Sequence, residues 1–323
     1  PPPYAEGGVM IDLLAELPRL DNVLLRREAL ELGVDDKRLA RMVGAGDLVR
    51  LRHGIYADAR VWGKADSRTR HLLLATGVRR LYGDTVALSH VSAALAYGAP
   101  DWQLGYDSVH VTHLNGFAGR RQARTVHHRG SCYVDDLTVD EHGWITTPAR
   151  TFVDVAKSLP TAVALVVADW ILHKGLATKD QLWDALDRQG EAPYTLRIRA
   201  VIAHADPLAE SVGETRSRYE FRAAGLPDPV PQLEIRDARG RFLARVDFAW
   251  PELKVIVEFD GRVKYDDMLK PGQTILDVIR AEKRRDRDLA ALGWTVIRIE
   301  WDDLATPGPV MQRIRQALSR RAA

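Results

Sequence analysis

The sequence contains very little cysteine, since Cys132 is the only one among 323 residues. A single thiol excludes an intrachain disulfide framework and a cysteine-rich zinc site. Long apolar runs are also missing, because the longest, TAVALVVADWIL at 161–172, is interrupted by Asp169. A membrane-spanning helix needs about 20 consecutive apolar residues. This run therefore predicts a buried helix, and we expect no membrane partner.

Two further absences bear on location and charge. The opening stretch PPPYAEGGVMIDLL lacks a basic start and a long apolar segment, so we expect no secretory signal and a cytoplasmic protein. Neither sign of charge dominates, because 46 basic and 44 acidic side chains leave a net charge of +2. Any nucleic-acid binding must come from local basic clusters, found at 41–54, 119–129 and 280–287. The alternative for each cluster is a solvated face.

The length and the pattern of elements predict an α+β protein of several domains. We place a winged helix-turn-helix at 1–60, a mixed α/β middle domain at 61–205 and a third α/β domain at 206–323. In the first segment, MIDLLAEL, LLRREALELG and KRLARMVGAG have helical apolar spacing, and LVRLRHGIYA alternates like a hairpin. Three helices and a hairpin are the plan of a winged helix, whose third helix enters the major groove. The alternative is a generic three-helix bundle.

The pattern of the middle segment predicts helices and a pair of alternating strands, and the segment contains several histidines. His90, His110, His113, His127 and His128 lie in or beside these strands. They show no helical H-x-x-x-H spacing and have no acidic partner at ligand spacing. We therefore favour polar strand and cap residues over metal ligands.

The third segment predicts the order α-β-β-β-α-β and then a last helix from about residue 309. Its strands carry Asp247, Glu258 and Asp260 among Val, Ile and Phe. If two of the strands form a hairpin, Asp247 faces Glu258 across the pair. Carboxylates at that distance repel one another, and a divalent cation such as Mg²⁺, with Mn²⁺ as an alternative, removes the penalty. A bound cation can activate water and stabilise the transition state of phosphodiester hydrolysis.

Other side chains could complete such a site. Lys264 and Lys283 are the candidates for a basic group near the attacking hydroxide, while Glu210 and Glu214, one helical turn apart, could add a carboxylate. The alternative to the whole cluster is an acidic strand end that faces solvent.

At these residues the third segment resembles a known family. ESVGETRSRYEFRAAGLPDP, ARVDFAWPELKVIVEFDGRVKY and EKRRDRDLAALGWTVIRIEW are similar to the very-short-patch-repair (Vsr)-like branch of the PD-(D/E)XK nucleases, over about 208–318. The resemblance implies a restriction-endonuclease-like core that cleaves DNA with a metal ion. It assigns Glu214, Asp247 and Glu258 as the acidic motif residues, and Asp260 stands where the family has lysine. Trp294 and Trp301 are expected to be packing residues.

The first part resembles the winged-helix domain of AbiEi-like antitoxins of type IV toxin–antitoxin systems. GAGDLVRLRHGIYA matches the end of the recognition helix and the wing, and LSHVSAALAYGAP, VHVTHL and TTPARTFVDVAKSL match the domain that follows. The resemblance implies DNA binding and autoregulation of transcription. The residues that it implies as DNA contacts are Lys37, Arg38, Arg41, Arg50, Arg52 and His53.

Together these observations predict a DNA-binding protein with a Mg²⁺-dependent endonuclease domain. Its expected partner is double-stranded DNA, with a cognate toxin and a second copy of the chain as further partners. The alternative is an antitoxin-like repressor whose nuclease fold is catalytically silent, which the missing motif lysine favours. A nuclease acting on RNA is a third interpretation, because the metal chemistry does not distinguish the sugars.

Overall fold

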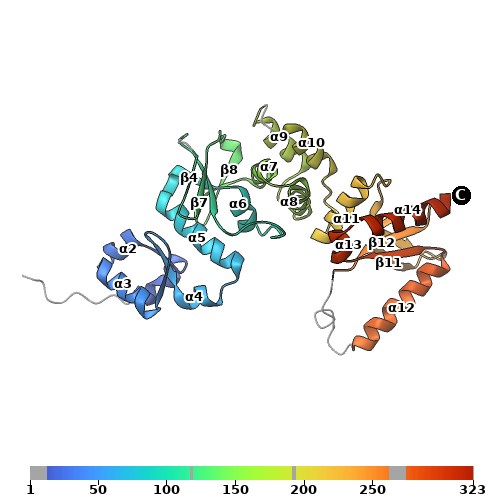
Figure 1. Cartoon of the computed structure of the whole chain (residues 1–323), viewed down its shortest axis with the longest axis horizontal. Helices are drawn as coiled ribbons and strands as arrows, with labels where there is room; N and C mark the ends of the chain where they lie inside the picture. The colour runs from blue at the N-terminus through green and yellow to red at the C-terminus, as the bar shows by residue number, and fades with distance from the viewer. Residues whose placement is uncertain (1–12, 117–118, 191–193, 262–273, 323) are drawn as a thin grey trace, which may run out of the picture. The chain divides into compact units, whose positions relative to one another are not determined.

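The computed structural model describes residues 13–116, 119–190, 194–261 and 274–322. The chain forms two compact units: the first contains residues 1–167 and 175–204, and the second contains residues 168–174 and 205–323. Figure 1 follows the chain from blue to red through both of them. Helix α8 (Thr161–His173) contributes residues to each unit. Among the described residues, no helix is both long and apolar enough to cross a membrane.

The first unit contains a three-stranded and a six-stranded sheet. The three-stranded sheet has the order β1-β3-β2, and the six-stranded sheet has the order β6-β7-β5-β4-β9-β8. Its elements are α1 (Leu13–Glu16), η1 (Leu17–Leu20), β1 (Val23–Leu25), α2 (Arg26–Glu31), α3 (Asp36–Ala45), β2 (Leu48–Arg52), β3 (Ile55–Asp58), α4 (Ala59–Lys64), α5 (Ser67–Tyr82), η2 (Gly83–Thr85), β4 (Val86–Leu88), α6 (His90–Ala96), β5 (Val109–His113), β6 (Arg120–Gln122), β7 (Thr125–His128), η3 (Val134–Asp136), β8 (Leu137–Asp140), β9 (Gly143–Thr146), α7 (Pro148–Ser158), most of α8, α9 (Lys179–Asp187) and α10 (Thr195–His204).

The segments that the sequence analysis separates at residue 60 share one hydrophobic core. Val23 and Ile55 from the small sheet pack with Leu74 of α5 and Val111 of β5 in a single buried cluster. Gly77 of α5 permits this approach, because a Cβ there would lie 2.4 Å from the Ile55 side chain. The small sheet is therefore held rigidly against the rest of its unit.

One expected helix is shorter than predicted, and its first residues form a strand. LLRREALELG was expected to be helical, but β1 occupies Val23–Leu25 and α2 begins at Arg26. All three residues of β1 are completely buried, and they pair antiparallel with β3. A short run that is apolar on every side fits a buried strand as well as a helix, so periodicity alone could not separate the two.

The histidines of the middle segment pair with one another. His110 Nδ1 lies 2.9 Å from His128 Nε2, and His113 Nε2 lies 2.9 Å from His127 Nδ1, in both cases between β5 and β7. His90 begins α6, and its ring stacks on that of His128. Burial lowers the pKa of these imidazoles, to about 4 for His110 and about 3 for His128. The structure thus places them as strand and helix-start residues.

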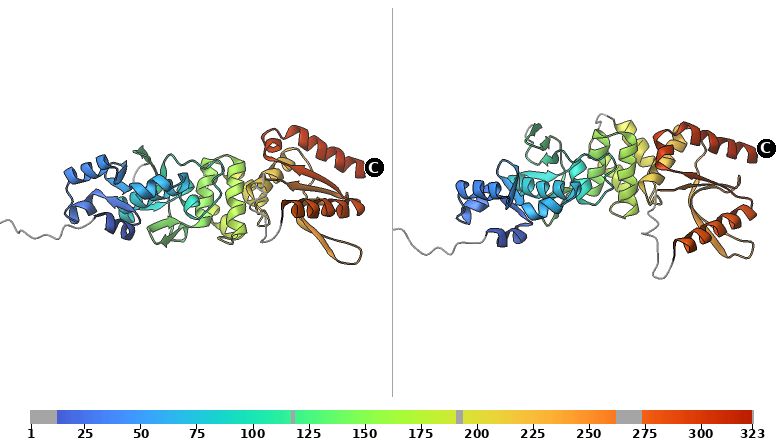
Figure 2. Two further views of the ribbon diagram at one scale, coloured as in Figure 1. Left: turned by 90° about the horizontal axis from the view of Figure 1, so that it is seen from below. Right: turned by 60° about the horizontal axis from the view of Figure 1, so that its bottom comes forward.

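The second unit is a four-stranded sheet with helices on both faces. The strand order is β10-β11-β12-β13, antiparallel except for the parallel pair β12–β13. Helices α12 and α14 lie on opposite faces of this sheet in both views of Figure 2. The elements are the end of α8, α11 (Val212–Ala223), β10 (Val230–Arg236), β11 (Phe242–Trp250), β12 (Val255–Phe259), α12 (Ile275–Ala291), β13 (Thr295–Ile299), α13 (Trp301–Ala305) and α14 (Gly308–Ala322).

The alternation of apolar residues along the strands accounts for the two-sided packing. Phe248 and Val257 pack on the face that α14 covers, through Ile314. Ala249 and Ile256, one residue along on each strand, belong to a second cluster with Leu289 of α12. Trp294 and Trp301 are packing residues as expected, since the first joins the α12 cluster and the second meets Phe259 edge to face.

The N-terminus of α11 comes unusually close to β12. A Cβ on Gly213 would lie 2.0 Å from the ring of Phe259, which is closer than carbon atoms approach one another. We expect Gly213→Ala to lower the free energy of unfolding by about 1–3 kcal/mol, as overpacking of a core typically does. Urea denaturation would measure the change.

The control for this substitution is Gly63→Ala in α4, where a Cβ would meet no atom within 4 Å. Helix propensity alone should then raise the free energy of unfolding by about 0.5–1 kcal/mol. Equal effects of the two substitutions would contradict the close approach at Gly213.

Candidate functional site

Four polar side chains stand next to one another across the sheet of the second unit. In the β10–β11 pairing, the neighbouring residues on both sides are paired, so Gln232 of β10 lies opposite Asp247 of β11. The β11–β12 register, extended by one residue beyond its last pair, places Asp247 beside Glu258. Glu258 in turn pairs with Arg298 of β13. We call these four residues the polar row. The expected hairpin between Asp247 and Glu258 is therefore present, with the expected register.

Within the polar row, Asp247 is a carboxyl group whose pKa is raised. Its Oδ2 accepts a hydrogen bond of 2.8 Å from the backbone N–H of Phe259. Burial, together with the negative charges of Glu214 and Glu258, raises the pKa of Asp247 to about 6. The N–H of Phe259 and the charge of Arg285 oppose the shift but do not cancel it. Ionised Asp247 therefore lacks sufficient positive charge around it.

Glu258 has a partner that the sequence analysis did not identify. Arg285 of α12 bonds both of its carboxylate oxygens; the Nη1 to Oε2 distance is 3.1 Å. Arg285 precedes the buried Leu289 by four residues, so both lie on the side of α12 that faces the sheet. That spacing is the signal that could have singled out Arg285 among the basic residues of EKRRDR.

The basic residues proposed from the sequence lie elsewhere. Lys283 is exposed, and two positions along a helix place it about 200° around the axis from Arg285. Lys264 falls outside the described residues. Asp260 is exposed at the end of β12, where its backbone N–H donates to the carbonyl of Ile299. The structure thus brings Arg285, rather than Lys283, to the carboxylates.

Glu214 lies beside the polar row, but its carboxylate is hydrogen-bonded to the start of its own helix. It is the third residue of α11 and its carboxylate accepts from the hydroxyl of the N-cap Ser211 and from the backbone N–H of Glu210. The amide of Gln232 donates to it as well, at 2.9 Å. Glu210 was expected on this helix, but it precedes the first turn and forms an exposed ion pair with Arg245.

As arranged, these residues do not fit a divalent cation. Oxygen ligands are the right chemistry for Mg²⁺ or Mn²⁺, but Glu258 is bound to Arg285 and Glu214 to the start of α11. Across the residues that the structure describes, no group of three or more His, Cys, Asp or Glu is placed to hold a metal ion. A cation would need at least one of these carboxylates to change partner.

The residues proposed to contact DNA are divided between surface and interior. Lys37 and Arg41 are exposed on α3, which begins at the N-cap Asp35; the backbone N–H of Arg38 donates to that cap. In the hairpin, Arg50 is exposed and lies 2.8 Å from His53 Nδ1.

Arg52 differs from the expectation, because it turns inward. Its guanidinium donates to the hydroxyl of Thr125 in the six-stranded sheet, at 2.5 Å. The residue follows a register shift in the β2–β3 pairing, which redirects its side chain. Arg52 therefore links the hairpin to β7 rather than projecting from it.

A groove separates α3 from the hairpin. Its volume is about 660 Å³, and its lining residues are Arg26, Asp36, Ala40, Val43, Arg50, His53 and Tyr56. Arg26 and Asp36 form a bidentate ion pair that fixes the first turn of α3. The pair thus links the starts of α2 and α3 at the edge of the groove.

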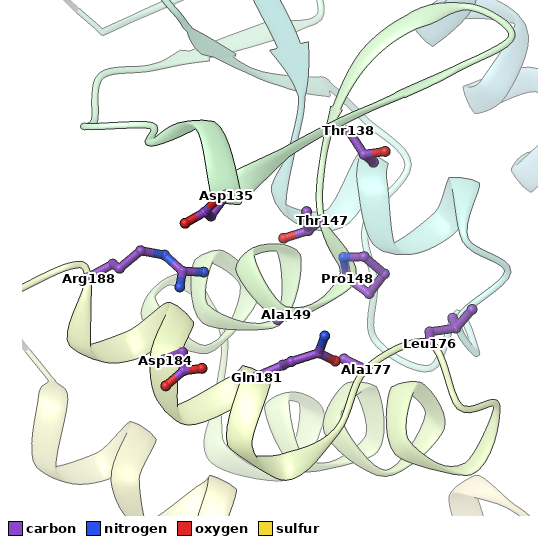
Figure 3. A pocket seen from close by; sticks show the side chains of 10 residues that line it. All are labelled: Asp135, Thr138, Thr147, Pro148, Ala149, Leu176, Ala177, Gln181, Asp184 and Arg188. Carbon is purple, nitrogen blue, oxygen red and sulfur yellow. The ribbon is translucent and has the colours of Figure 1, made fainter.

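A second hollow lies between α7 and α9 (Figure 3), with a volume of about 410 Å³. Asp135 and Asp184 bring negative charge to it, and Arg188 brings the positive charge. Arg188, however, is bound to the buried Asp136, which also pairs with Arg150 of α7. The positive group of the hollow is therefore committed to Asp136.

Comparison with known proteins gives one family match and two relatives. Residues 12–57, which include α3 and the β2–β3 hairpin, match the family described as "Transcriptional regulator, AbiEi antitoxin". The relatives are "Uncharacterized protein MT2308" and "Uncharacterized protein Rv2248", from two strains of Mycobacterium tuberculosis. Each is 31% identical over 176 residues, which is 54% of this chain and 62% of the relative. The similarity to AbiEi regulators therefore lies in the part of the first unit that carries Lys37, Arg41 and Arg50.

Proposed function

We propose that the first unit is the DNA-binding part of a transcriptional regulator. Helix α3 would enter the major groove, and the β2–β3 hairpin would contact the adjoining backbone as a wing. The observation that supports this most is that Lys37, Arg41 and Arg50 are exposed on these two elements, within the residues that match the AbiEi regulators. From the same match we propose participation in a toxin–antitoxin pair.

The physical basis of binding would be phosphate contact. Exposed lysine and arginine side chains neutralise phosphates and release counterions, which makes affinity depend on salt. The ion pair of Arg26 with Asp36 and the bond of Arg52 to Thr125 would fix α3 and the hairpin before DNA arrives. Such preorganisation lowers the entropic cost of association. Because operators of winged-helix proteins are commonly read by symmetric pairs, we propose that two chains bind one site.

We expect Lys37→Ala, Arg41→Ala and Arg50→Ala each to weaken binding of duplex DNA regardless of its sequence. Each lost phosphate contact should reduce the slope of log affinity against log salt by about 0.9. Fluorescence anisotropy over a salt series would measure it. Arg199→Ala, which removes an exposed arginine from α10, is the control and should leave the slope unchanged. Identical slopes for all five proteins would rule out this surface.

A second candidate function is a metal-dependent endonuclease in the second unit. The observation that favours it is that Asp247 is buried beside Glu258, with its pKa raised first by burial and then by the charges of Glu214 and Glu258; a bound cation would offset these effects. Residues Asp247 and Glu258 would hold the cation only after Arg285 has left Glu258, and the cation would supply an activated water and charge stabilisation at the phosphate. Duplex DNA is the proposed substrate because the first unit would deliver it, and RNA is the alternative.

Supercoiled plasmid incubated with Mg²⁺ or Mn²⁺ should then be nicked or linearised. We expect Asp247→Asn and Glu258→Gln to reduce the rate by about 100-fold or more, since each would remove a metal ligand. Glu234→Gln, on the exposed part of β10, is the control. If no plasmid is cut while DNA binding is intact, the endonuclease proposal is wrong and the regulator proposal stands.

The raised pKa of Asp247 predicts a pH-dependent effect on stability in EDTA. Because its folded pKa is about 6, above the usual 3.8, the stability that protonated Asp247 contributes is present at low pH. It is lost as the pH rises from about 4 through 6. We expect Asp247→Asn to raise the free energy of unfolding by about 1–2 kcal/mol at pH 8 and to have little effect at pH 4. A pH-independent effect in urea titrations would contradict the repulsion.

A further inference from the structure

The basic cluster that the sequence shows at 280–287 forms one stripe on helix α12. Its members are spaced at i, i+3, i+4 and i+7, and such positions share one face of a helix. All of them are exposed, and we call them the basic stripe: Arg280, Lys283, Arg284 and Arg287. The stripe extends about 10 Å along the helix axis, because each residue adds about 1.5 Å.

The basic stripe lies on the side of α12 that faces away from the sheet. Its centre is roughly 170° around the helix axis from the buried Leu289, at about 100° per residue. Arg285, between two members of the stripe in sequence, bonds Glu258 on the inner side of the helix. Helix α12 therefore separates the basic stripe from the polar row.

The acidic residues of α12 do not neutralise the basic stripe. Glu282 and Asp286 both form ion pairs with Arg298 of β13. Asp277 is hydrogen-bonded to the N-cap of the helix, and Asp288 is half-buried. Among the residues that the structure describes, no member of the basic stripe forms an ion pair. The positive charge of the stripe is therefore uncompensated.

The members of the basic stripe also repel one another. Arg280 and Arg284 are four residues apart, as are Lys283 and Arg287, and like charges at this spacing destabilise a helix. A face that meets only water would avoid this cost with charges of alternating sign. An anion bound along the stripe would turn the repulsion into attraction, because each side chain would then meet an opposite charge.

The surroundings of the stripe favour a phosphodiester backbone over other polyanions. A helix that binds membranes needs an exposed apolar face, but the apolar side of α12 packs on the sheet through Leu289. A protein partner needs apolar or aromatic anchors at the centre of the interface. Of the described residues of α12, Leu276 in the first turn is the one large apolar side chain that is exposed. Phosphate needs no such anchor, since guanidinium and ammonium groups bind its oxygens directly.

We propose that the basic stripe binds the phosphate backbone of duplex DNA without reading the bases. The inference rests on the proposed function of the first unit, which brings the chain to duplex DNA. The stripe is a different place from the polar row, so DNA held there is not positioned for hydrolysis at Asp247. The second unit thus adds a second point of attachment on one chain, which raises the affinity by effective concentration. This contribution is independent of cleavage.

The test compares the full chain with a stripe variant that carries Arg280→Gln, Lys283→Gln and Arg284→Gln. Binding of a fluorescent duplex is followed by anisotropy over a salt series. We expect the slope of log affinity against log salt to fall by about 2.7, which is about 0.9 for each lost phosphate contact. An unchanged slope would overturn the proposal.

A matched control changes the net charge by the same amount elsewhere in the second unit. It carries Arg236→Gln, Arg239→Gln and Arg241→Gln, all exposed at the turn between β10 and β11. The slope of this control should equal that of the unchanged chain. An equal fall in both variants would overturn the proposal, because net charge rather than the stripe would then determine the affinity. Thermal unfolding shows that both variants are folded.

Lys283 gives a direct readout of the contact. Acetylation by an N-hydroxysuccinimide ester, followed by mass spectrometry, measures the reactivity of each lysine in the full chain. We expect duplex DNA to slow acetylation of Lys283 several-fold and to leave Lys254, exposed in the turn before β12, unchanged. Equal reactivity of Lys283 with and without DNA would contradict the contact.

The first-unit variant with Lys37→Ala, Arg41→Ala and Arg50→Ala separates the two proposals. A lower slope in this variant, with an unchanged slope in the stripe variant, would support DNA binding by the first unit and overturn binding by the stripe. The opposite result would overturn the first-unit surface and support the stripe. Binding of phosphatidylglycerol vesicles that only the stripe variant loses, with its DNA slope unchanged, would assign the stripe to a lipid surface and overturn the proposal.

Discussion

Asp247 and Glu258 stand side by side on β11 and β12, and an apolar sheet cannot bury both as ions unless donors or positive charge lie close by. The fold of the second unit provides them from two directions: β12 offers the backbone N–H of Phe259 and α12 offers Arg285. Helix α11 adds a third carboxylate, Glu214, which is bound by Gln232 and Ser211 and whose charge raises the pKa of Asp247. The positions of both helices relative to the sheet therefore bear on the charge of the row.

Other buried carboxylates in this protein are satisfied differently. Asp136 is bound by Arg150 and Arg188, and Asp169 by Arg218 together with the hydroxyl of Thr215 and a backbone N–H. Each has at least two donors and lies in a nearly water-free place. These networks are structural: breaking one would strand a buried charge. The carboxylates of the polar row are more exposed and have fewer donors, as the 13% exposure of Glu258 and the single backbone donor to Asp247 show.

In the second unit, the features that depend on neighbouring residues, namely the strands and the hairpin register, could be predicted from the sequence. Period-two alternation located β11 and β12, and the turn between them set the register that joins Asp247 to Glu258. Arg285 was missed because it meets Glu258 through the packing of a helix on a sheet, at a separation of 27 residues. Lys283 has the same charge and lies two positions away, and composition cannot tell which of the two faces inward.

The role of Glu214 could not be obtained from its motif position either. Ser211 and Glu214 have the spacing of a helix-capping pair, so one carboxylate fits both a helix start and a metal site. Only the three-dimensional contacts decide between them. In the first unit, the strand β1 was mistaken for helix because a fully apolar triplet has no periodicity.

Two features of the polar row are energetically unfavourable: the raised pKa of Asp247 and the backbone conformation of Gln232. Its φ is 51°, a left-handed conformation in the middle of β10 that L-residues seldom adopt in strands. That conformation accompanies the hydrogen bond from its amide to Glu214. Residues held in such conformations cost about 1–3 kcal/mol and tend to gather at functional sites. A row that served packing alone could use apolar residues at both positions and avoid both costs. Both costs lie on neighbouring strands, and a ligand at the row, as the second candidate function proposes, would account for them.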